Sequence, residues 1–127
     1  MKAMAKAWVE KAEADFGTAQ REQKNKKGAN YDAVCLHAEL CAERYLKARL
    51  AEDEIPFPST RHIVVLLMLC VDLEPKWESF REQIRTLSSF AIEVEDPDMV
   101  ADEKMAEMAM EACEAFRTAA RKSLGLK

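Results

Sequence analysis

Apolar side chains recur at steps of three and four residues along most of this chain, which is the spacing that puts them on one face of an α-helix. The first stripe consists of Ala5, Trp8, Ala12, Phe16 and Ala19. Later stripes are Trp77, Phe80, Ile84, Leu87 and Ala91, and Met105, Met108, Ala109, Ala112, Phe116, Ala119 and Ala120. Only 3 Gly and 4 Pro interrupt 127 residues, and no stretch reads convincingly as a strand, so the sequence predicts an all-α fold.

The stretch from residue 31 to residue 52 differs from the others because it is apolar on two faces. One face carries Tyr31, Val34, Cys35, Ala38, Ala42 and Tyr45, and the second carries Leu36, Leu40, Glu43, Lys47 and Leu50. Two apolar faces indicate a central helix with neighbours on both sides. We therefore expect one domain over residues 1–127, an up-and-down bundle of about five helices with short connections.

Local signals place the boundaries of these helices. The first two expected helices cover about residues 2–24 and 31–52. The third holds the apolar run 63–71, the fourth follows Pro75 with a stripe that ends at Ala91, and the fifth begins near Asp102 and stops at Gly125. Gly28 can supply a positive φ and Asn30 a cap between the first two helices. The two prolines of the segment 55–58 keep it non-helical. Ser59 or Thr60 is expected to cap the third helix, which is apolar nearly all round and should be deeply buried.

Charge and hydropathy exclude several classes of protein. The net charge of −4 gives no general attraction for nucleic acid, so we predict no DNA binding. The segment from Met1 to Glu22 is charged throughout and predicts no signal peptide. The longest apolar run, Ile63 to Val71, has nine residues and is too short to span a bilayer. We expect a soluble, cytoplasmic protein without a membrane partner.

Three features leave a choice between a structural and a binding role. Arg21 to Lys27 is a basic run, and Glu93 to Glu103 carries six carboxylates and no Lys or Arg. Both are typical of solvated helix ends and loops, with a docking surface for a charged partner as the alternative. The methionines at 105, 108 and 110 belong either to the core or to an adaptable binding surface.

The sequence offers few residues for metal binding or catalysis. Its four cysteines lie among apolar helical neighbours and are expected to be reduced and buried. His37 and Cys41 could share a helix face, but two ligands do not make a zinc site, so we predict no metal and no cofactor. No nucleophile or phosphate-binding motif occurs, and we assign no catalytic residue. We interpret His37 as a surface or satisfied core histidine, and His62 as a polar helix end or an anion contact.

The charged residues of the central helix allow two interpretations. Glu43 and Lys47 have the spacing and order of a favourable intrahelical ion pair. Arg44 and Lys47 also share their part of the helix with leucines, and such charges on a central helix favour an interface or a cleft. Both interpretations remain open at this point.

Several motifs, in order, resemble one known family. They are Trp8, Ala12 and Asp15, then Tyr31-Asp32, Cys35 to Glu39 (CLHAE), Ala42 to Ala48 (AERYLKA), Pro58, and Thr60 to Leu67 (TRHIVVLL). Leu87 to Asp98 (LSSFAIEVEDPD) is similar to a later family stretch that commonly contains Arg-Tyr-Pro-Asp. Together these motifs resemble the HEPN domain of bacteria and archaea, an all-helical bundle. The resemblance extends from Trp8 to about Leu124.

The chain departs from the HEPN pattern at two places. Many HEPN proteins are metal-independent ribonucleases with an Arg-x(4–6)-His motif on a late helix, and this sequence has no histidine after His62. Glu95-Asp96-Pro97 stands where the family commonly has Arg-Tyr-Pro, which removes a basic residue. Position 61 holds Arg where the family usually has His. These departures favour a non-catalytic protein.

The resemblance implies a homodimer, with a proposed role in nucleotide or substrate binding, often beside a separately encoded minimal nucleotidyltransferase. We therefore predict a nucleotide- or partner-binding module, with a ribonuclease that uses His37 or His62 and a purely structural dimer as alternatives. For a nucleotide, Arg44 and Lys47, together with Arg61 and His62 at the start of the third helix, would bind the phosphates. Backbone N–H groups at that helix start would add to the attraction.

Overall fold

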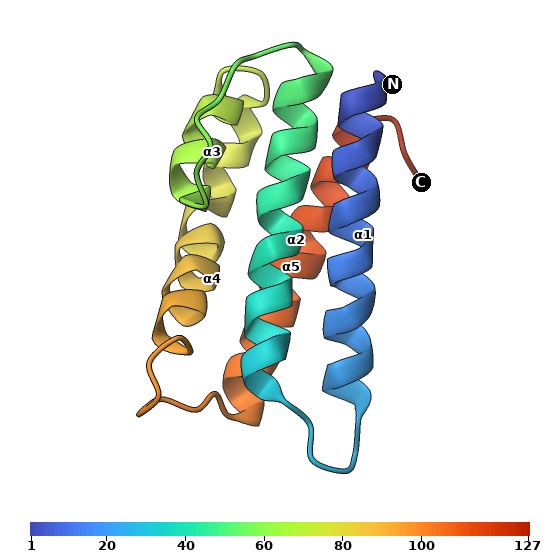
Figure 1. Cartoon of the computed structure of the whole chain (residues 1–127). Coiled ribbons are helices and arrows are strands. Elements are labelled where there is room, and N and C mark those ends of the chain that lie inside the picture. The colour runs from blue at the N-terminus through green and yellow to red at the C-terminus, as the bar shows by residue number, and fades with distance from the viewer.

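The structure is a computed structural model that covers residues 1–127, and it confirms the all-α bundle (Figure 1). Five α-helices and one 3₁₀-helix follow one another without a strand. They are α1 (Ala3–Lys24), α2 (Tyr31–Glu52), α3 (Ile63–Val71), η1 (Pro75–Phe80), α4 (Arg81–Glu93) and α5 (Glu103–Ser123). None of these helices has both the length and the apolar character needed to cross a bilayer.

Helix α2 is the centre of the bundle, as its two apolar faces predict. It packs against α1 on one side and against α3 and α4 on the other, and α5 lies behind it in Figure 1. Val34, Ala38 and Tyr45 are fully buried on one face, and Leu50 is fully buried on the second. All four cysteines are free thiols in the core, as expected.

The predicted signals between α1 and α2 are confirmed. Gly28 adopts a φ of 72°, a left-handed conformation that other residues rarely adopt. The side chain of Asn30 accepts a hydrogen bond from the backbone N–H of Ala33 at 3.0 Å and so caps α2. Together these two residues reverse the chain, and α2 returns antiparallel to α1 (Figure 1).

Two expectations for α3 are wrong. The residue at its N-cap is His62, which makes no side-chain cap, and the hydroxyl of Thr60 instead accepts from the N–H of His62 at 3.0 Å. The helix is not buried all round, because Val65 is 47% exposed and Met68 is 39% exposed. A helix of nine residues packs against α2, η1 and α4 only, and its remaining side faces solvent.

The expected fourth helix begins as a 3₁₀-helix, from Pro75 to Phe80, before α4 starts at Arg81. A 3₁₀ turn places residues three apart on one side of the chain. The rings of Trp77 and Phe80 accordingly both meet Phe116 of α5 edge-on, with ring centroids 5.0 and 5.4 Å away. This aromatic cluster fixes the packing of η1 against α5.

The connection between α2 and α3 positions the candidate site. It leaves the end of α2 at Glu54, which has a positive φ of 55°, and runs back along the helix before α3 begins (Figure 1). Arg61 therefore lies beside the middle of α2, next to Glu39 and Glu43, although Glu52 ends that helix about 20 Å further along by its rise per residue.

Candidate functional site

A chain of charged groups lies between the middle of α2 and the α2–α3 connection. Glu39, Glu43 and Lys47 are spaced by four residues, so they share one face of α2. Lys47 Nζ donates to Glu43 Oε2 at 3.1 Å, and Arg61 Nε donates to Glu43 Oε1 at 3.3 Å. The other end of the Arg61 guanidinium donates to Glu39 Oε2 at 2.8 Å. Glu43 thus joins two cations, and Arg61 joins two carboxylates.

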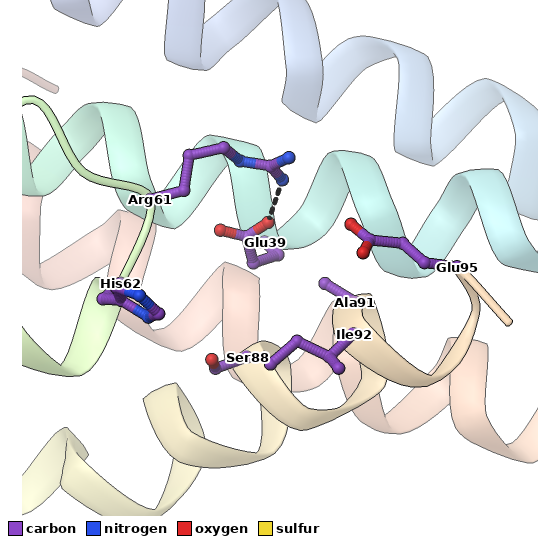
Figure 2. Close-up of a pocket in the computed structure, with 7 residues that line it drawn as sticks. All are labelled: Glu39, Arg61, His62, Ser88, Ala91, Ile92 and Glu95. Carbon is purple, nitrogen blue, oxygen red and sulfur yellow. Dashed lines mark hydrogen bonds and ion pairs between the residues drawn. The ribbon is translucent and has the colours of Figure 1, made fainter.

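A small pocket of about 110 Å³ opens beside this chain of charges (Figure 2). It is formed by α2, the end of the α2–α3 connection and the C-terminal part of α4, and it is lined by Glu39, Arg61, His62, Ser88, Ala91, Ile92 and Glu95. In Figure 2 the carboxylate of Glu95 points back toward Glu39 across the pocket. The lining therefore contains two carboxylates, one guanidinium and one imidazole.

Glu39 is the most unusual residue of this pocket. Its side chain comes from the middle of α2, and the residue is only 2% exposed. Arg61 binds one of its oxygens, while Oε1 is buried and has no hydrogen-bond donor. Burial raises the pKa of Glu39 from its ordinary 4.5 to about 7, because the partial compensation by Arg61 does not replace the lost water.

The four residues predicted to bind phosphate do not all meet at one place. Arg61 and His62 line the pocket. Lys47 is linked to Arg61 through their shared partner Glu43, and its ammonium lies 5.1 Å from the centroid of the Trp8 ring. The ion pair between Lys47 and Glu43, one of the two interpretations of the sequence, is present, and both residues are buried.

Arg44 turns away from this group and toward α1. It forms an ion pair with Asp15, which is 5% exposed. The other carboxylate oxygen of Asp15 lies 2.9 Å from His37 Nδ1. One ring nitrogen of His37 is thus bound to a buried carboxylate, and about a third of its side chain remains exposed. Arg44 and His37 thus belong to a second polar cluster.

Sequence reasoning missed three polar residues of the pocket, namely Glu39, Ser88 and Glu95. The spacing of Glu39 and Glu43 on a helix with two apolar faces was the available signal, since buried carboxylates need partners. Ser88 and Glu95 belong to the stretch that resembles the later family motif, but the sequence does not show that the packing of α4 against α2 brings them to the pocket.

The pocket is small, and most of its lining is polar or charged. No three His, Cys, Asp or Glu side chains are grouped closely enough to hold a metal ion. The volume is below the 300–1,000 Å³ typical of pockets that enclose a whole drug-sized ligand. The pocket therefore has room for a head group of a few atoms, with hydrogen-bonding partners on two sides.

Comparisons with known proteins agree with the helical architecture. The family model described as HEPN domain matches residues 5–123, which is nearly the whole chain. No significant match was found among the curated proteins or among the solved structures. The match covers all the residues that line the candidate pocket, from Glu39 to Glu95. This chain belongs to the HEPN domain family.

Proposed function

We propose that this protein is a non-catalytic HEPN-type binding module that works as a homodimer and docks a separately encoded minimal nucleotidyltransferase, as in a toxin–antitoxin pair. The observation that carries the proposal is the exposed side of α3. This helix contains no polar residue, yet Val65 and Met68, one turn apart, remain open to solvent. Apolar side chains that are grouped on an outer helix favour burial against another chain.

Light scattering tests the dimer. We expect a mass near twice the 14.4 kDa of the monomer, with an interface on the order of 1,500 Å². A mass that stays near 14.4 kDa at every concentration contradicts the homodimer. The nucleotidyltransferase is tested by mixing this protein with the product of a short nucleotidyltransferase gene encoded beside it. Separate elution of the two proteins contradicts the docking role.

Nucleotide binding is a second candidate, supported by the place of Arg61 and His62. Both residues stand at the start of α3, where backbone N–H groups lack helical partners, and the Arg61 side chain is 53% exposed. Calorimetric titration with ATP and GTP tests this candidate, with Arg61→Ala compared with the combined Arg44→Ala and Lys47→Ala variant. Binding that survives all three changes places the nucleotide elsewhere, and absence of binding leaves the partner-docking or purely structural dimer.

A ribonuclease with a site outside the family motif is the remaining candidate, and the pair of His37 and Asp15 favours it. A carboxylate bound to one ring nitrogen orients a histidine for general acid–base chemistry through the other nitrogen. The absence of any histidine after His62 weighs against this candidate. We expect no cleavage of single-stranded RNA by the purified protein. Cleavage that is lost in His37→Ala or His62→Ala would establish the enzyme instead.

A further inference from the structure

We propose that the pocket beside Glu39 binds one organic cation, an alkylguanidinium or alkylammonium group, whose N–H donors bind Glu39 and Glu95. This role is separate from the dimer and partner docking proposed above. The ligand is either a free small base or the side chain of an arginine or lysine. The shared chemistry is a single positive head group on an aliphatic stem.

The first argument is the unpaired oxygen of Glu39. Glu39 Oε1 is buried and has no donor, while the neighbouring Oε2 accepts from Arg61. A buried carboxylate oxygen without a donor destabilises the folded state, so a ligand that brings a donor to it is bound favourably. In Figure 2 this oxygen lies on the side of the carboxylate nearer the connection that carries His62, at the pocket.

The second argument is the balance of charge. The negative charges of Glu43 and Glu95 both act on the carboxylate of Glu39. Against these three carboxylates stand two cations, Arg61 and Lys47, which form ion pairs with Glu39 and Glu43. When all three carboxylates are ionised, these five groups are short of one positive charge. The raised pKa of Glu39 agrees with this deficit, because the negative charges of Glu43 and Glu95 add to the effect of burial. One bound cation restores neutrality, whereas a phosphate increases the imbalance.

The third argument is the shape of the pocket. Its volume of about 110 Å³ has room for a guanidinium or ammonium group but cannot enclose a whole nucleotide. Ala91 and the exposed Ile92 form an apolar part of the lining on which an aliphatic stem can lie. A planar guanidinium also suits a carboxylate, since its donors are arranged in parallel. The hydroxyl of Ser88 supplies one further acceptor.

The experiment is an NMR titration of the full chain with methylguanidinium, compared with methylurea, which has nearly the same shape and no charge. We expect methylguanidinium to shift the amides of Ser88, Ala91 and Ile92 with a saturable curve, and methylurea to bind at least 10-fold more weakly. Equal effects of the two probes, or shifts that never saturate, overturn the proposal. ATP that moves the same amides more strongly than methylguanidinium shows an anion site and also overturns it.

Variants of single residues test which carboxylates bind the cation. Glu39→Gln keeps the shape of the side chain and should weaken methylguanidinium binding at least 10-fold. Glu95→Gln lies at an exposed position outside any helix, so it leaves the fold intact and should weaken binding several-fold. Glu114→Gln, an exposed position on α5 outside the pocket lining, is the matched control and should change nothing. Unchanged binding in both pocket variants overturns the proposal.

Two larger probes distinguish the sources of the cation. Agmatine represents a free alkylguanidine, and N-acetyl-arginine amide represents an arginine within a protein. Tighter binding of agmatine assigns the site to a small-molecule base, and tighter binding of the arginine amide assigns it to a partner side chain. Failure of both to bind, in a protein that still forms the dimer, rejects this inference alone and leaves the proposed function standing.

Discussion

Two buried carboxylates, those of Asp15 and Glu39, differ in how many of their oxygens have a hydrogen-bond partner. Asp15 on α1 is bound on both oxygens, by His37 and by Arg44. Glu39 on α2 is bound on one oxygen only, and burial raises its pKa to about 7. An acid whose pKa rises on folding binds its proton more tightly in the folded state than in the unfolded state. The free energy of unfolding therefore depends on the protonation of Glu39 between about pH 4.5 and pH 7.

Replacement of Glu39 by Gln tests this dependence. The stability that Glu39 contributes is fully present below its unfolded pKa near 4.5 and declines as the pH rises toward its folded pKa of about 7. Arg61, His62, Glu43 and Glu95 face this carboxyl from the connection, from α2 and from the end of α4. In urea unfolding at a series of pH values, we compare the unfolding free energy of Glu39→Gln with that of the wild type. We expect this difference to shift in favour of the variant by about 2 kcal/mol between pH 5 and pH 8. A constant difference over that range contradicts the titration.

Glu13→Gln is the control of opposite sign. A hydrogen bond from Arg117 lowers the pKa of Glu13, so this carboxylate stabilises the folded protein above its ordinary pKa and loses the effect as the pH falls. The variant should be less stable than the wild type at pH 7, and the gap should narrow in acid. If both variants follow the same pH curve, global charge rather than these local contacts sets the behaviour.

At the scale of the elements, the ends of the helices differ in how they are stabilised. Asn30 caps α2 and Asp102 caps α5, and each of these side chains accepts from a backbone N–H in the first turn of its helix. Helix α3 has no such cap, and it begins where the extended connection ends at His62. The start of α3 is therefore held by tertiary contacts, which include the ion pairs of Arg61 with α2 and the burial of Ile63 in the core.

Asn30→Ala measures the contribution of the α2 cap. Loss of the 3.0 Å hydrogen bond to the N–H of Ala33 should cost about 1 kcal/mol of unfolding free energy, and Asn30→Asp should restore most of it. Ser59→Ala is the comparison, because Ser59 was a predicted cap but lies three residues before the N-cap of α3. We expect less than about 0.5 kcal/mol there. A larger loss from Ser59→Ala than from Asn30→Ala contradicts the observed start of α3.

At the scale of the whole molecule, one buried hydroxyl joins three helices. Tyr45 of α2 is fully buried, and its hydroxyl donates to Glu13 of α1 and accepts from Arg121 of α5 at 3.0 Å. Glu13 also receives two hydrogen bonds from Arg117 of α5, each 2.7 Å long. This network connects α1 to α5, which otherwise touch only sparingly because α2 lies between them.

Tyr45→Phe tests that network without changing the apolar ring. The change leaves Glu13 and Arg121 each one partner short, so we expect a loss of about 1–2 kcal/mol in the urea unfolding free energy at an unchanged slope. Arg85→Ala removes an exposed ion pair with Glu82 and should cost less than about 0.5 kcal/mol. A loss no greater than that of Arg85→Ala shows that water replaces the tyrosine hydroxyl at no cost.

The sequence by itself determined the elements of this protein. The apolar spacing, the scarcity of Gly and Pro, and the signals at Gly28 and Asn30 predicted five helices, including the bounds of α2. The same patterns, with the motifs around His37 and Arg61, indicated the HEPN family that the family model confirms. These features depend on contacts within a few residues, since a helix and its cap are formed by neighbours in the chain.

Only the tertiary structure decided which charges meet. Arg44 and Lys47 are three residues apart, yet one binds Asp15 of α1 and the other shares Glu43 with Arg61. The pocket depends on a connection that runs back along α2, which no local pattern encodes, and on the side of α4 that faces Glu39. Burial then shifts the pKa of Glu39, because desolvation depends on every element that covers the carboxyl and not on its neighbours in the sequence.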